Sequence, residues 1–201
     1  MIIIDEEMSG LDPRTHSILS LGAVDFSNPK RQFYREARLR RGATADPEAM
    51  KVNGFTLKQI KDKGKQTEKE MILKLCRWMD ETNDRTLAGH NVQNDIKFLK
   101  HAIALYKIDY KINSRAVDTF ALVYESCLKR KVRMPMKDNM ADLKSDVVFR
   151  YCGLKEEPQP HNALTGARME AESFSRLIYG KNLLKEFNKF KIPEYLAPGN
   201  F

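Results

Sequence analysis

Two acidic residues near the N-terminus have the spacing of a pair on one face of a strand. Asp5 and Glu7 follow an apolar opening run, which predicts a short strand over residues 1–7. Side chains alternate between the two faces of a strand, so both carboxylates project from one side, about 7 Å apart along the backbone. Two such groups repel each other unless a cation lies between them. The pair therefore predicts a cation site, or else two ordinary surface acids.

The residues after this pair predict a tight turn. Gly10 is followed by Leu11 and by the dipeptide Asp12-Pro13. Glycine has no side chain, so the backbone can approach a ligand closely at such a turn.

A second polar cluster runs from His90 to Asp95, with the sequence HNVQND. It joins a short buried strand, predicted over 86–89, to a helix predicted over 95–106. A carboxylate in the first turn of a helix also suits the helix dipole. Asp95 is therefore either a site residue or an N-terminal cap, and capping is equally an alternative for Asn91 and Asn94.

A histidine stands just ahead of a helix predicted over 164–179. His161 begins the segment HNALTGA. The pKa of histidine lies naturally near neutrality, so its side chain suits a general base. The alternative is a structural histidine that only makes hydrogen bonds.

In their order and spacing, these three motifs resemble those of the DEDDh exonucleases, the family of proofreading subunits, RNase T and oligoribonuclease. The matching segments are DEEMSGL from Asp5, HNVQNDIKFL from His90 and HNALTGA from His161. Asp118-Thr119 also matches a dipeptide that the family carries between the last two motifs, and this aspartate is expected to be structural. The resemblance covers about residues 1–180.

The resemblance implies a metal-dependent 3′→5′ exonuclease that hydrolyses phosphodiester bonds. Two divalent cations about 4 Å apart can activate a water and relieve charge on the leaving oxygen, and hard oxygen ligands suit Mg²⁺ or Mn²⁺. By resemblance, Asp5 bridges both ions, Glu7 holds the ion that bears the nucleophilic water, and Asp95 helps to hold the second ion. His161 takes the proton of the water.

The resemblance also suggests how a substrate binds. A single-stranded 3′ end of DNA or RNA is expected, because the scissile phosphate and its base must both reach a recessed site. Leu11 would pack on the last base and Asn91 would bond to the sugar or phosphate, although a simple turn and a cap explain them equally. The expected substrate-binding residues are Met8, Ser9, Gly10, Leu11 and Asn91.

Three positions depart from the family pattern, and at one of them Asn94 replaces a phenylalanine that is frequent before the metal-binding aspartate. Gly166 stands five residues after His161, where the family has an aspartate that binds the nucleophile-side ion. Its loss predicts a weakly active or inactive enzyme. Glu170 lies one helical turn beyond, near the same face, but its carboxylate would have to shift by about 6 Å along the axis to replace the aspartate. Glu6 replaces a usually apolar residue, and strand alternation predicts that it points away from the metals.

The elements that must position these residues start as strands and continue as alternating helices and strands. That order predicts a mixed sheet covered by helices, and the resemblance specifies an α/β fold with an RNase H-like, mixed five-stranded sheet flanked by helices. Residues 130–139 are predicted as a loop. Strands are predicted over 1–7, 18–26, 32–39, 86–89 and 116–117, and helices over 47–52, 56–63, 67–82, 95–106, 119–129, 140–151 and 164–179.

Length and composition set the remaining expectations. A chain of 201 residues suits one domain, which we place at residues 1–180, with a basic tail over 181–201 that packs on the domain or on a partner. Cys76, Cys127 and Cys152 have no metal-ligand spacing and are expected to be reduced core thiols. The opening run is too short to span a bilayer and lacks a basic start. A cytoplasmic protein without membrane contact is expected.

A formal charge of +8 and a pI near 9.3 favour a polyanionic partner. The basic segments 129–133 and 181–191 would grip a nucleic-acid backbone or form solvated surface. A homodimer and a polymerase partner are both compatible with the resemblance. The alternative to an exonuclease is a non-catalytic nucleic-acid-binding or polymerase-accessory module that keeps the fold, and a third reading is a structural interaction protein without a nucleic-acid role.

Overall fold

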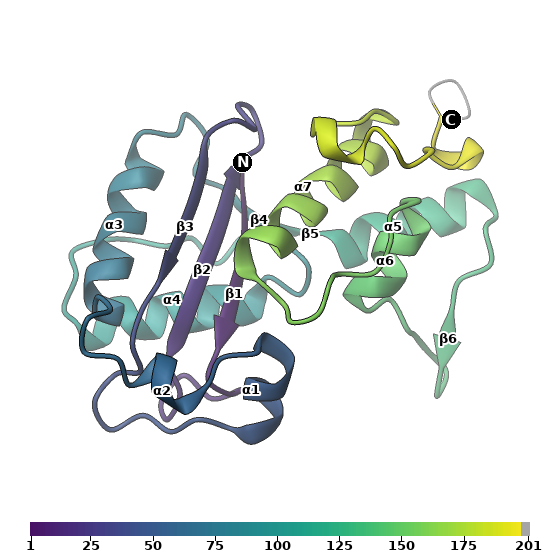
Figure 1. The fold of residues 1–201 in the computed structure, drawn as a ribbon. Coiled ribbons are helices and arrows are strands. Elements are labelled where there is room, and N and C mark those ends of the chain that lie inside the picture. The colour runs from purple at the N-terminus through teal and green to yellow at the C-terminus, as the bar shows by residue number, and fades with distance from the viewer. Residues whose placement is uncertain (198–201) are drawn as a thin grey trace.

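Five strands form a mixed sheet in the order β3-β2-β1-β4-β5 (Figure 1). The computed structural model describes residues 1–197. The strands β1 (Ile2–Met8), β2 (Ile18–Asp25) and β3 (Gln32–Glu36) are antiparallel neighbours. β4 (Leu87–Gly89) runs parallel to β1, and β5 (Ala116–Asp118) runs parallel to β4. The predicted mixed five-stranded sheet flanked by helices is confirmed.

Helices cover both faces of this sheet. α7 (Ala163–Tyr179) packs on β1 and β2, where Ile3 joins a cluster with Ala167, Ala171 and Phe174. The neighbouring residues Ile2 and Ile4 face the opposite way and enter the core formed with α3 (Glu68–Asp80) and α4 (Gln93–Leu105). β1 is therefore buried on both sides, and its odd-numbered residues face α7.

Two short helices, α1 (Pro47–Asn53) and α2 (Leu57–Ile60), lie at the end of the sheet where β1 finishes (Figure 1). Thr56 and Thr67 each begin a helix with a reciprocal capping box, made with Gln59 and Glu70 respectively. These side chains satisfy the first free N–H groups of α2 and α3, which accounts for the positions at which both helices start.

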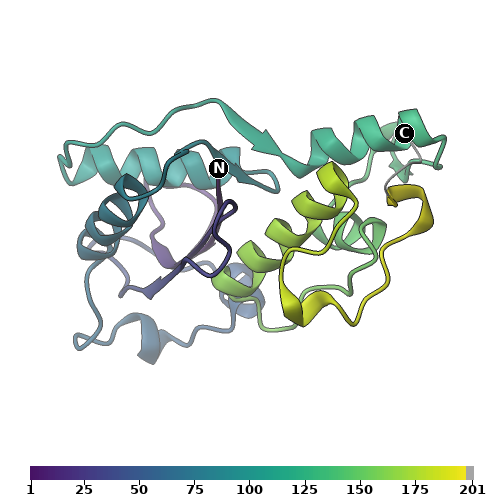
Figure 2. The same cartoon turned by 90° about the horizontal axis from the view of Figure 1, so that it is seen from above.

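A second apolar cluster lies beyond the sheet, on the far side of α7 (Figure 2). It is built by α5 (Thr119–Arg130), α6 (Ser145–Tyr151) and two 3₁₀ turns at Lys185–Phe187 and Glu194–Leu196. Residues 181–197 therefore pack on α6 and α7, while residues 198–201 of the expected tail lie outside the described part. The division of the chain at residue 180 stays a prediction.

A buried ion pair fastens this C-terminal segment to α7. Arg176 donates to the Glu172 carboxylate at 2.8 Å, and both side chains have no exposed surface. Its guanidinium also donates to the backbone carbonyls of Phe187 and Phe190, each at 3.1 Å. The other Glu172 oxygen accepts from the N–H groups of residues 183 and 184. Every charge in this group has a partner inside the protein.

A small hairpin replaces the start of one predicted helix. β6 (Met136–Lys137) pairs with β7 (Met140–Ala141) through Asp138 and Asn139, whose φ angles are 51° and 61°. Two successive residues with positive φ make a tight hairpin turn. α6 begins only at Ser145, so the predicted helix from residue 140 was wrong over its first turn.

The three cysteines are buried and free. Their burial fits the expected core thiols, since desolvation raises the pKa of the Cys152 thiol to about 12. Over residues 1–197, none of the helices is long and apolar enough to cross a membrane.

Candidate active site

The end of β1 directs two carboxylates toward α7. Asp5 Oδ2 lies 2.1 Å from the point where a Cβ of Gly166 in α7 would be, and Glu7 lies near His161 in the loop before the same helix. Glu6 between them is buried and leaves the opposite face of the strand, as alternation predicts. Burial raises the pKa of Glu6, and so do the charges of Asp95 and Asp5 and then that of Glu68 of α3, so its carboxylate still lies near the acids of the site.

Asp95 reaches the same end of the sheet from the first turn of α4. Its side chain is buried, and its charged neighbours include Asp5 and Glu7. α4 begins at Val92 without a side-chain cap. Instead, the Asp118 carboxylate accepts from Val92 N–H at 3.1 Å and from Phe120 N–H at 2.8 Å. Asp118 therefore fixes the starts of α4 and α5 together, in agreement with a structural role.

His161 approaches from the loop before α7. Its ring is 26% exposed, and Nδ1 lies 3.8 Å from Oε2 of Glu157. The next residue, Asn162, caps α7 by accepting from the N–H groups of Leu164 and Thr165. The cap fixes the helix start, and with it the position of the histidine.

Glu157 is a member of the cluster that no motif indicated. It comes from the loop between α6 and α7, yet its side chain is only 7% exposed. Ligand atoms of Glu7, Glu157 and His161 all lie within 4.8 Å of one another. In the sequence Glu157 is one of two adjacent glutamates before a proline, and nothing in that pattern distinguishes it from a surface acid.

Gly166 and Glu170 complete the set on α7. A Cβ atom on Gly166 would lie 2.1 Å from Asp5 Oδ2 and 3.4 Å from Glu157 Oε1, so this position faces the carboxylates. Glu170 is buried one turn further on, with Asp5 and Asp95 as charged neighbours. The side chain of Glu170 therefore belongs to the cluster.

The cluster is electrostatically strained without a cation. Burial, followed by repulsion from neighbouring carboxylates, raises the pKa of Asp5 to about 8 and that of Glu7 to about 9. Burial also raises the pKa of Glu157, and it raises those of Asp95 and Glu170 well above the ordinary range. Over residues 1–197, none of these five acids forms an ion pair with a lysine or arginine.

The donor atoms present fit divalent cations. The carboxylates supply the hard oxygen ligands that Mg²⁺ and Mn²⁺ prefer. One Glu170 oxygen, Oε2, is buried without a hydrogen-bond partner. A cation would give that oxygen a partner and remove the repulsion between the acids.

The turn after β1 forms a wall beside the acids. Ser9 is buried, donates to the Thr44 carbonyl at 2.8 Å and accepts from Ser17 N–H at 2.9 Å. A Cβ on Gly10 would lie 2.3 Å from the ring of His16, so any other residue would require that ring to shift. Leu11 is 83% exposed and free to meet a ligand. The backbone is fixed, and one apolar side chain projects from it.

Helix α1 ties this wall to the histidine loop. Asn53 donates from Nδ2 to the Met8 carbonyl at 3.1 Å, while the preceding carbonyl, that of Val52, accepts from His161 N–H at 3.0 Å. Two adjacent residues at the end of one helix therefore hold both sides of the site.

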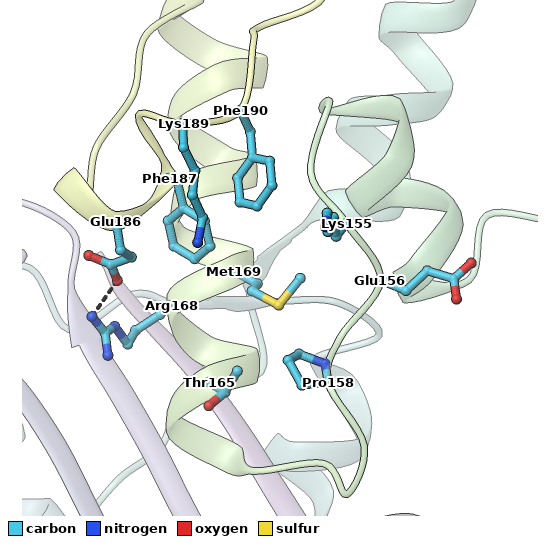
Figure 3. A pocket seen from close by; sticks show the side chains of 10 residues that line it. All are labelled: Lys155, Glu156, Pro158, Thr165, Arg168, Met169, Glu186, Phe187, Lys189 and Phe190. Carbon is cyan, nitrogen blue, oxygen red and sulfur yellow. Dashed lines mark ion pairs between the residues drawn. The ribbon is translucent and has the colours of Figure 1, made fainter.

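Two cavities flank the cluster. One of about 420 Å³ is lined by His90, Asn91 and Asp118, so exposed Asn91 borders a hollow beside the acids. The larger one, of about 600 Å³, lies between α7 and the C-terminal segment (Figure 3), with Phe187 and Phe190 on one side and the ion pair of Arg168 with Glu186 beside them. None of the clustered acids lines either cavity.

Comparisons with known sequences agree with this geometry. The model of an exonuclease family, RNase_T, matches residues 2–174. The chain is 30% identical over 188 residues to DNA polymerase III subunit epsilon of Rickettsia felis, covering 90% of this chain and 74% of the relative. It is 32% identical over 223 residues to the same subunit of Rickettsia typhi, covering 94% and 93%.

Solved structures share the fold at low sequence identity. The nuclease domain of 3'hExo, described as a DEDDh family member bound to rAMP, superposes with a TM-score of 0.67 at 17% identity, covering 96% of this chain and 95% of that one. The cell-death related nuclease 4 (CRN-4) gives a TM-score of 0.69 at 12% identity, covering 90% and 64%. Because the family model spans nearly the whole of the sheet and α7, this chain belongs to the RNase_T family of exonucleases.

Proposed function

We propose that this chain removes nucleotides one at a time from the 3′ ends of single-stranded nucleic acid by metal-dependent hydrolysis. The observation that carries the proposal is the meeting of Asp5, Glu7, Asp95 and His161 at one end of the sheet. These residues come from β1, α4 and the start of α7, three segments far apart in the sequence.

Asp5, Glu7 and Asp95 would hold two Mg²⁺ or Mn²⁺ ions. When bound, such ions supply a nucleophilic water at neutral pH and stabilise charge on the leaving oxygen. His161 would accept the proton of the attacking water. Since its Nδ1 faces Glu157, Nε2 is the ring atom left for this transfer.

The fixed turn would receive the terminal nucleotide. Met8, Ser9 and Gly10 would present backbone to it, and the exposed Leu11 would pack on the last base. Asn91 borders the adjacent cavity and would bond to the sugar or phosphate. The basic composition supports binding of a polyanion.

A polymerase is the partner that we propose. The relatives with 30% and 32% identity are named as subunits of DNA polymerase III, and the alignments cover most of each relative. A homodimer stays a second prediction. Gly166 also supports an alternative, a polymerase-accessory module that binds nucleic acid without cutting it, because the family's carboxylate is missing there.

The test is release of nucleotides from single-stranded DNA and RNA labelled at the 5′ end, with Mg²⁺ or Mn²⁺, for the chain and for Asp5→Asn. Stepwise shortening from the 3′ end that needs metal and is lost in the variant supports an exonuclease. Salt-dependent binding without shortening supports the accessory module instead. Neither binding nor shortening contradicts both.

A further inference from the structure

The space beside Gly166 is occupied by two carboxylates from elsewhere in the chain. Asp5 Oδ2 lies 2.1 Å and Glu157 Oε1 lies 3.4 Å from the point where a Cβ of residue 166 would be. An aspartate at 166 would send its own carboxylate into this same space. Glu157 Oε1 therefore lies within the reach of the side chain that the glycine lacks.

Glu157 is held in this position by contacts of its own. Its backbone N–H donates to the Asp146 carboxylate at 3.2 Å, which ties the loop to α6. Its Oε1 accepts from Asn162 N–H at 3.4 Å, at the cap of α7. The adjacent Glu156 is 60% exposed and pairs with Arg150. The loop thus turns one of two successive glutamates into the site and the other to solvent.

The position of Glu157 matches the nucleophile side of the site. It lies with Glu7 and His161, the residues to which we assign the attacking water. Glu170 has different surroundings. The charges that act on it most strongly are those of Asp5 and Asp95, and its carboxylate accepts a hydrogen bond from the backbone of His90. Glu170 is therefore nearer to α4, on the side assigned to the second ion.

We propose that Glu157 supplies the metal ligand that Gly166 lacks, so that the site has a full set of carboxylates drawn from a different part of the chain. This inference rests on the proposed metal-dependent function. Gly166 alone predicts a weakly active or inactive enzyme. With Glu157 as a ligand, the site binds the nucleophile-side ion and hydrolyses the phosphodiester bond. The substitution of one acid for another leaves the chemistry the same and moves its source from α7 to the preceding loop.

Binding of Mn²⁺ to the full chain, measured by calorimetry or by the electron paramagnetic resonance of free Mn²⁺, tests the inference without relying on activity. Glu157→Gln is expected to weaken the tighter site by about 10-fold or more, the scale on which removal of supporting groups acts at metal sites. Glu156→Gln is the matched control and is expected to bind as the unmodified chain does. Equal affinity of Glu157→Gln and the control would overturn the inference, and so would a loss seen only in Glu170→Gln.

A rescue experiment separates ligand loss from damage to the fold. Gly166→Asp in the Glu157→Gln background is expected to recover Mn²⁺ affinity, after Asp5 rotates to make room, whereas Gly166→Asp alone is expected to give no gain. If Gly166→Asp alone tightens binding and Glu157→Gln has no effect, the glycine is a true vacancy and the inference fails. Thermal unfolding in EDTA confirms that each variant is folded.

Failure of the proposed function looks different from failure of this inference. If the unmodified chain binds no Mn²⁺, the proposed metal-dependent reaction is contradicted, and so is the role of Glu157 as a metal ligand. If the chain binds Mn²⁺ and Asp5→Asn abolishes binding while Glu157→Gln does not, only the assignment of Glu157 is overturned.

Discussion

Helix α7 carries two sets of buried charged side chains, one paired within the protein and the other not. At Glu172 and Arg176, a carboxylate and a guanidinium with no exposed surface satisfy each other and the backbone around them. Less than one turn earlier, Glu170 faces Asp5 and Asp95 with one oxygen unpartnered. The same helix thus buries an acid paired with an arginine and, among residues 1–197, an acid that has no lysine or arginine partner.

The difference identifies which group is structural. Burying a charge is costly unless it is paired and hydrogen-bonded. The pair meets that condition from within the chain and fastens the C-terminal segment. The acids at the end of the sheet do not meet it, so their neutralisation must come from bound protons or from cations.

The largest effect is expected from breaking the structural pair. Arg176→Met leaves Glu172 buried without its partner, which should lower the free energy of unfolding by about 3–5 kcal/mol. Urea unfolding followed by circular dichroism measures this loss. The double variant Arg176→Met with Glu172→Leu removes both charges and is expected to regain part of it. A single variant as stable as the parent would show that the pair contributes nothing.

Neutralising an acid of the site should lower the rate of hydrolysis without lowering the stability of the metal-free protein. Asp5→Asn removes one repelling charge, so the metal-free protein is expected to become no less stable, while nucleotide release falls by at least about 100-fold because a metal ligand is worth several kcal/mol at the transition state. Unfolding in EDTA and initial rates with Mn²⁺ are measured side by side. Loss of stability together with rate would place Asp5 in the structural group.

The site should also make the metal-free protein sensitive to pH. Asp5 and Glu7 have pKa values raised to about 8 and about 9, so the folded chain binds more protons than the unfolded chain from about pH 4 upward. Stability without metal is therefore expected to fall as the pH rises from 5 to 9. Mn²⁺ needs ionised carboxylates, so it should raise the melting temperature more at pH 8 than at pH 6. Melting scans at both pH values decide this.

The smallest effect is expected at the exposed wall. Leu11→Ala removes a side chain that is 83% exposed, so the melting temperature should not change. Loss of about 1 kcal/mol of apolar contact with a base should raise KM about 5-fold with little change in kcat, because this contact is made equally in the ground state and the transition state. Steady-state kinetics on single-stranded DNA measure both constants. An unchanged KM would mean that Leu11 does not touch the substrate.

The parts of the molecule with a regular period could be predicted from the sequence. β1 follows from an apolar run ending in Asp5 and Glu7, and α3 and α7 follow from their helical stripes, so the sheet and its covering helices were predicted in the correct order. β6 and β7 have two residues each, too few for a period to appear. The first turn of the predicted helix at 140 was wrong for that reason.

The residues of the candidate site could be predicted only where they belong to a motif that resembles the family's. The motifs predicted Asp5, Glu7, Asp95 and His161, and the i+4 relation to Gly166 put Glu170 near the same face. The burial of Glu157 depends on hydrogen bonds with Asp146 and Asn162 on either side of its loop, and on the packing of that loop beside Glu7, which is distant in the sequence. No local pattern carries that information.

The short helix α1 has a mechanical consequence. Its last turn holds the Met8 carbonyl through Asn53 and the His161 amide through Val52. The turn that would meet a nucleotide and the loop that bears the histidine are thus connected through two adjacent residues, Val52 and Asn53. In the proposed function, a terminal nucleotide that displaced the turn at Met8 would also act on the loop of His161, because both are hydrogen-bonded to the end of the same helix.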